Sequence, residues 1–138
     1  MTTGARHRLV AYDGSAPARV ALHRAVELTA PGDAVSVINV MPEPGVSARI
    51  GPPRERQRQG ELLHEAAEYL AGHGIDAELI PAVGNAAHEI LAAAVEVGAD
   101  VIVVARHRGR HGPHILGSVT TRVVRDAGCD VLVVHGDA

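Results

Sequence analysis

The 138-residue chain contains no lysine, no phenylalanine and no tryptophan. Without lysine it has neither the phosphate-binding lysine of a Walker motif nor a Schiff-base nucleophile. Tyr12 and Tyr69 are its only tyrosines, so it lacks the rows of aromatic rings on which single-stranded nucleic acids stack. The hydrophobic core must therefore be built from alanine, valine, leucine and isoleucine.

Cys129 is the single cysteine, so no internal disulfide forms and a reducing cytoplasm is the expected compartment. No apolar run approaches the roughly 20 residues of a membrane span, and the N-terminus lacks the apolar core of a signal peptide. The formal net charge of -3 gives no reason to expect nucleic acid as a partner. We therefore expect a cytoplasmic protein that binds neither membranes nor nucleic acid.

Short β-branched runs alternate with longer amphipathic runs along the chain. Strands are predicted over 8–12, 34–41, 76–83, 100–105 and 129–135, and helices over 13–30, 54–72, 86–97 and 114–127. Ser15 and Asn85 are suited to cap helices, and Gly98 is suited to end one. The alternation predicts an α/β fold with a parallel sheet covered by helices on both faces, in a single domain spanning residues 1–138.

Proline and glycine interrupt this pattern at two places. Residues 42–55 are rich in both and show no periodicity, which predicts a mobile loop. Pro81 lies inside a predicted strand, and its missing N–H favours an edge position in the sheet. The arginine-rich run at 54–61 is interpreted as a solvated helix face. Because arginine is unfavourable at a helix N-terminus, we expect that helix to start nearer Glu61.

The topology predicts where a ligand binds. Open parallel sheets bind ligands beyond the carboxyl ends of their strands, where the strand order reverses. Asp13 follows the first strand, and its carboxylate is suited either to cap the next helix or to accept hydrogen bonds from a ligand. The loop after the fourth strand contains Gly109, Gly112 and the pair Gly117–Ser118. Glycines let backbone N–H groups approach a phosphate, and the start of the following helix favours an anion.

Three blocks of sequence resemble the universal stress protein family: VAYDGS near the start, INVMPE after the second strand, and VIVVARHRG followed by GSVTTRVVRDAGCDVLVV. The resemblance covers nearly the whole chain. It implies a Rossmann-like, adenine nucleotide alpha hydrolase-like sheet of parallel strands in the order 3-2-1-4-5, with two helices on each face. It also implies a cytoplasmic stress-response protein that forms a homodimer. Residues 131–135 are a candidate exposed edge strand for that contact.

One branch of this family binds ATP through a motif written G-x2-G-x9-G-[S/T]. The resemblance implies that Asp13 meets the adenine or ribose and that Val40 lines the base pocket. The backbone of Ala11 and Tyr12 would lie beside the base. The phosphates would be held at the start of the last helix by a run of small residues, namely Gly117, Ser118, Val119 and Thr120.

The glycine motif of this chain is degenerate. Ala105 stands at the first glycine and Arg108 or Gly109 at the second, and the loop is about one residue short. Arginine forks bind phosphate well, so Arg106, Arg108 or Arg110 is a candidate for compensating charge. The expected ligand is ATP, with ADP or AMP as alternatives and Mg²⁺ bound through the phosphates.

Three functions stay open on the sequence. A nucleotide-binding regulatory module ranks first. A non-nucleotide-binding universal stress protein, acting through protein–protein interaction, ranks second. An enzyme, either a slow ATPase or an adenylyl transferase, ranks third, because no general base stands out beside the phosphates. His107, His111 and His114 lie close together, but their spacing matches no zinc site, so no metal is expected.

Overall fold

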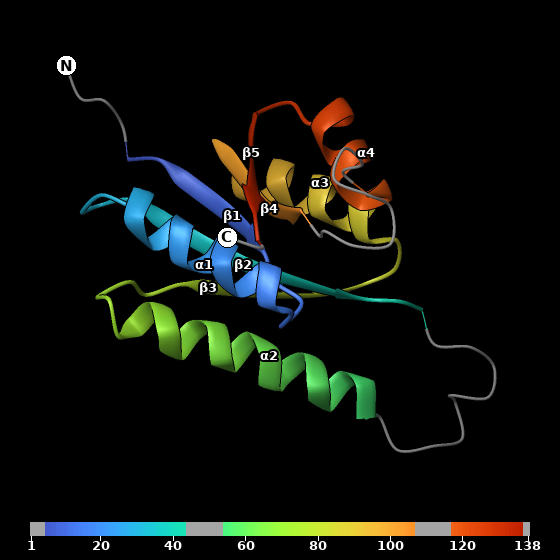
Figure 1. The fold of residues 1–138 in the computed structure, drawn as a ribbon, viewed down its shortest axis with the longest axis horizontal. Helices are drawn as coiled ribbons and strands as arrows, with labels where there is room; N and C mark the ends of the chain where they lie inside the picture. The colour runs from blue at the N-terminus through green and yellow to red at the C-terminus, as the bar shows by residue number, and fades with distance from the viewer. Residues whose placement is uncertain (1–4, 44–53, 107–116, 137–138) are drawn as a thin grey trace.

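The computed structural model describes residues 5–43, 54–106 and 117–136. Within these ranges strands and helices alternate, as the sequence predicts (Figure 1). The strands are β1 (His7–Ala11), β2 (Ala34–Met41), β3 (Glu78–Val83), β4 (Val101–Arg106) and β5 (Asp130–His135). The helices are α1 (Ala16–Leu28), α2 (Arg54–Ala71), α3 (Ala86–Val97) and α4 (Ser118–Asp126).

The five strands form one parallel sheet in the order β3-β2-β1-β4-β5. This order confirms the expectation drawn from the family resemblance. Val10 lies at the centre of the sheet, where it pairs with Val37 of β2 on one side and Val103 of β4 on the other. Pro81 pairs with Asn39 on the edge strand β3, where its missing N–H removes no bond to a further strand.

Two helices cover each face of the sheet (Figure 1). Helices α1 and α2 pack on one face, against Val10, Val37 and Val103. Helices α3 and α4 pack on the other, against Leu9, Ile38 and Ile102. The buried apolar side chains are alanine, valine, leucine and isoleucine throughout the described residues, with Tyr12 as the single aromatic exception. The layered core expected from the composition is therefore present.

Local capping signals set the ends of α1 and α3. The Ser15 hydroxyl accepts a hydrogen bond from the backbone N–H of Ala18 at 3.2 Å, and the Asn85 side chain accepts from His88 N–H at 3.0 Å. Gly98 ends α3 in the left-handed conformation, at φ 68° and ψ 42°. These three residues act as the sequence predicts, because caps depend on near neighbours along the chain.

The start of α2 agrees with the predicted span 54–72 and rules out the later start near Glu61. The helix begins at Arg54. Glu55 in its first turn supplies a charge that suits the helix N-terminus. Gln59, 5% exposed, donates from its side-chain nitrogen to the backbone oxygens of Asn39 at 2.8 Å and Ala82 at 2.9 Å. These bonds to β2 and β3 hold the early turns of α2 against the sheet.

Two other expectations concern the loop at 42–55 and membrane-spanning helices. Most of the predicted loop at 42–55 lies outside the described residues, and its last two positions belong to α2. Among the described residues, no helix is both long and apolar enough to cross a membrane.

Candidate functional site

A pocket of about 420 Å³ opens at the carboxyl ends of β1 and β4. The strand order reverses between these two strands, which is where open parallel sheets bind ligands. The volume lies in the range of small-molecule sites. Residues from β1, β2, β4 and the first turns of α1, α3 and α4 line it: Ala11, Tyr12, Asp13, Ala18, Ile38, Val40, Ala86, Ile90, Val104, Ala105, Gly117, Ser118, Val119 and Thr120.

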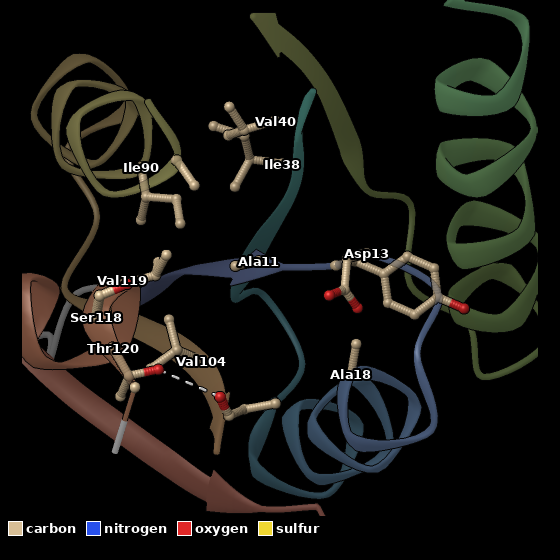
Figure 2. Close-up of a pocket in the computed structure, with 14 residues that line it drawn as sticks. Ala11, Asp13, Ala18, Ile38, Val40, Ile90, Val104, Ser118, Val119 and Thr120 are labelled. Carbon is tan, nitrogen blue, oxygen red and sulfur yellow. Dashed lines mark hydrogen bonds between the residues drawn. The ribbon is translucent and has the colours of Figure 1, made fainter. Parts of the chain in front are cut away.

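The pocket combines an apolar wall with polar groups on opposite sides. In Figure 2, Ile38 and Val40 of β2 lie together with Ile90 of α3 along one side. Asp13 lies on one side of Ala11, and the first turn of α4 lies on the other. The arrangement suits a ligand with a flat apolar part and a polar or charged end.

Asp13 does not itself cap α1, because Ser15 occupies the N-cap position. Instead, Asp13 Oδ1 accepts hydrogen bonds from the Ser15 backbone N–H at 3.0 Å and from the Ser15 hydroxyl at 2.6 Å. The hydroxyl in turn accepts from Ala18 N–H. The carboxylate thus orients the capping residue, and it is exposed at the pocket.

The first turn of α4 forms the other polar end of the pocket. Gly117 precedes the helix at φ 91°, a conformation that a side chain at this position would disfavour. No side chain among the described residues caps this helix, and backbone N–H groups at a helix start are suited to bind an anion. The Thr120 hydroxyl lies 3.3 Å from the carbonyl oxygen of Ala105, to which it donates (Figure 2). This bond fixes the turn against the end of β4.

Tyr12 connects the pocket to the α2 side of the sheet. Its backbone N–H donates to Ile38 O at 2.9 Å, and its backbone oxygen accepts from Asn39 Nδ2 at 2.8 Å. Its hydroxyl donates to Glu65 Oε1 on α2. Burial raises the pKa of Tyr12, and the hydrogen bond to Glu65 raises it further. The same bond lowers the pKa of Glu65. These contacts hold the chain rigid just before Asp13.

The residues expected at the nucleotide are largely gathered in this pocket. Its lining includes these predicted positions: Ala11, Tyr12, Asp13, Val40, Ala105, Gly117, Ser118, Val119 and Thr120. Arg106 lies next to the pocket rather than in its lining: it is 5% exposed, and its Nη1 is 3.2 Å from Nδ1 of His135 on β5. Arg108 and Gly109 lie outside the described residues.

Sequence reasoning missed two groups of residues. Ile38, Ile90 and Val104 line the pocket but were not predicted there, although Ile38 precedes Val40 by two positions and so shares its sheet face. Gln59 and Asn39 form a buried polar pair beneath Tyr12, with Gln59 Nε2 3.2 Å from Asn39 Oδ1. Their partners are distant in sequence, and no local pattern predicts that pairing.

Metal binding has no support within the described part of the chain. No group of three or more histidine, cysteine, aspartate or glutamate side chains is arranged there to hold an ion. His107, His111 and His114 lie outside the described residues.

Cys129 is partly exposed, and burial raises the pKa of its thiol, with Asp130 and Asp100 adding to the effect.

Comparison with known proteins agrees with this architecture. The profile of the universal stress protein family matches residues 5–135. The universal stress protein YxiE of Bacillus subtilis (strain 168) is 36% identical over 144 aligned positions, which cover 92% of this chain and 97% of that protein.

Two solved structures share the fold. A universal stress protein from Archaeoglobus fulgidus has a TM-score of 0.78 and 26% identity, and the match covers 94% of this chain and 98% of that one. The crystal structure of a universal stress protein in complex with cAMP has a TM-score of 0.80 and 25% identity, with coverage of 98% and 100%.

Proposed function

Because this chain belongs to the universal stress protein family, we propose that its pocket binds an adenine nucleotide and that occupancy regulates its interactions with partner proteins. ATP is the favoured ligand, with ADP or AMP as alternatives and Mg²⁺ carried by the phosphates. The observation that supports this most strongly is the pocket itself. It has an apolar wall on one side, and at opposite ends it has a carboxylate and a helix N-terminus that no described side chain caps.

The proposed roles follow from the chemistry of each wall. Val40 and Ile38 would pack against the adenine ring. Asp13 would accept hydrogen bonds from the ribose hydroxyls or the adenine amine, since a carboxylate is an acceptor. The phosphates would lie at the start of α4, where backbone N–H groups and the helix dipole favour an anion. A universal stress protein of the same fold forms a complex with cAMP, which supports an adenine ligand for this chain.

The proposal also includes a cytoplasmic homodimer. Strand β5 is the sheet edge opposite β3, and three of its side chains, Val131, Leu132 and Val133, are half-buried. An unpaired apolar edge strand favours pairing with a second copy. A regulatory module is favoured over an enzyme because the described residues that line the pocket include one carboxylate, Asp13, and no histidine.

The first test is to purify the protein without added nucleotide, denature it and identify any released small molecule by ion-exchange chromatography. The apo protein is then titrated with Mg-ATP by calorimetry. Bound nucleotide or micromolar affinity supports the proposal. The absence of both a released ligand and heat at millimolar ATP refutes it and favours the alternative, a universal stress protein that acts only through protein–protein contacts.

Two variants locate the site. Gly117→Arg fills the space before α4 and should abolish binding. Gly117→Ala is its control, because an added Cβ there meets nothing within 4 Å and only the positive φ causes strain. Asp13→Ala should weaken binding by about 1–3 kcal/mol if the carboxylate bonds the ligand. Ser15→Ala removes the helix cap but keeps that carboxylate, so it should leave affinity nearly unchanged.

A further inference from the structure

Arg106 is a buried arginine, and one edge of its guanidinium group donates no hydrogen bond within the described structure. Its side chain is 5% exposed, and its Nε and Nη2 have no hydrogen-bond partner within the described structure. Only Nη1 is engaged, 3.2 Å from His135 Nδ1. Because a guanidinium has no acceptor, Nη1 is the donor and the Nδ1 atom of His135 accepts. An unpaired buried charge is costly, and proteins keep one mainly where something else satisfies it.

The unused edge has a defined shape. Nε–H and one N–H of Nη2 point the same way from the planar guanidinium, and this two-donor fork matches two oxygens of a phosphate or carboxylate. His135 has no effect on this edge, because it occupies Nη1 on the other side of the group. The shape of this edge fits an anion with two accessible oxygens.

The position of Arg106 points to the nucleotide site. Arg106 follows Val104 by two residues on β4, so both side chains leave the same face of the sheet, and Val104 lines the pocket. Thr120 donates to the carbonyl oxygen of Ala105, so the first turn of α4 rests on β4 one residue before Arg106. An anion held at the N-terminus of α4 would therefore lie near the end of β4 that carries Arg106.

We propose that Arg106 sets the phosphate selectivity of the pocket by binding the terminal phosphoryl group of a nucleoside di- or triphosphate through Nε and Nη2. This inference rests on the nucleotide-binding function proposed above. In this chain Ala105 stands at the first glycine of the family motif. The side chain of Arg106 would therefore replace the backbone contacts to phosphate that a glycine-rich loop makes. AMP and cyclic AMP have no β- or γ-phosphoryl group and adenosine has no phosphate, so all three would leave the fork empty.

The test compares adenosine, AMP, ADP and ATP by calorimetry, together with apo thermal unfolding, in the wild type and three variants. Arg106→Met removes the fork. Arg106→Lys keeps the charge but not the paired donors. Arg125→Met is the control for loss of one positive charge, since Arg125 pairs with Asp126 on the surface of α4.

In the wild type, ATP and ADP should bind more tightly than AMP. Arg106→Met should lower the affinity for ATP on the order of 10- to 100-fold and leave that for AMP and adenosine within about twofold. Arg106→Lys should fall between the two, and Arg125→Met should match the wild type. The apo Tm of Arg106→Met should stay the same or rise, because an unpaired buried charge has been removed.

Three results overturn the inference. Equal loss of ATP and AMP binding in Arg106→Met would make the residue a general support of the pocket. A large drop in its apo Tm would make it a structural residue. Wild-type protein that binds AMP and ATP equally would remove the selectivity itself, with the nucleotide pocket intact. If the wild type binds none of the four ligands, the proposed function fails as well, so the two failures are distinguishable.

Discussion

Gln59 provides the sharpest test of how α2 supports the pocket. Its side-chain nitrogen lies within 3.2 Å of three acceptors: the backbone oxygen of Asn39, its side-chain oxygen Oδ1, and the backbone oxygen of Ala82. Asn39 in turn donates to the backbone oxygen of Tyr12, the residue before Asp13. Gln59→Leu keeps the approximate size of the side chain but removes the donor, so the acceptors around it lose a partner inside the protein.

The expected cost can be worked from these contacts. An unsatisfied buried polar group costs about 1–3 kcal/mol. Two of the acceptors belong to Asn39, which can relax together, and leucine gains some apolar burial at the same site. We therefore expect a net loss of roughly 2–3 kcal/mol in the free energy of unfolding. For a domain of this size, that lowers Tm by roughly 6–12 °C.

Thermal unfolding is monitored by circular dichroism. The folded protein is then titrated with nucleotide at a temperature about 20 °C below its Tm. Gln57→Leu is the matched control, because Gln57 is exposed in the same helix and should change Tm by less than about 2 °C. A Gln59→Leu variant as stable as this control would refute the argument. If Gln59→Leu also weakens nucleotide binding while folded, then the bond from Asn39 to Tyr12 positions the Asp13 carboxylate.

Three further predictions use other parts of the fold. Asp33 accepts from Ala30 N–H, Arg6 N–H and the Arg8 guanidinium, and these bonds lower its pKa to about 2. Its carboxylate therefore adds stability above about pH 4 that is lost as pH falls through 2. Asp33→Asn should be less stable than the wild type at pH 7. In urea titrations, this difference in the free energy of unfolding should shrink as pH falls from 4 to 2. Gly136→Ala places a Cβ 2.3 Å from Pro17 Cα and should cost about 1–3 kcal/mol. Gly128→Ala, whose Cβ would meet nothing within 4 Å, should be nearly neutral in the same unfolding assay. Val133→Arg on β5 should turn a dimer into a monomer in sedimentation velocity, and Leu79→Arg on the opposite edge strand should not; equal behaviour of the two would count against β5 as the contact.

Boundaries that depend on near neighbours were predictable from the sequence. Helix α3 spans 86–97 as predicted, since Asn85 caps its start and Gly98 ends it. Strand β2 spans 34–41 as predicted, because a largely apolar run lies between two segments that contain proline and glycine. The order of the strands came from the family resemblance, as local periodicity carries no information on which strands are neighbours.

The contacts that exclude a later start of α2, and the surroundings of Arg106, could not be predicted in the same way. Arginines at 54–58 argued for a later helix start, but Gln59 reaches carbonyl groups on β2 and β3, more than 15 positions away along the chain. Arg106 was expected to meet phosphate simply because it is charged. That expectation did not include its burial or its bond to His135, which is 29 positions away. Both depend on tertiary contacts that a single sequence does not display.

The pocket itself has a cause in the sequence that becomes plain only with the fold in hand. Protein interiors are close-packed, so a cavity persists only where side chains are too small to fill it. Four alanines line this one, and each comes from a different element or its end: Ala11, Ala18, Ala86 and Ala105. Larger residues at these positions would project into the space where β1 and β4 diverge. The core has no phenylalanine or tryptophan, and its one buried ring among the described residues, that of Tyr12, directs its hydroxyl to Glu65 on α2. These small residues therefore keep open the volume that the proposed ligand would occupy.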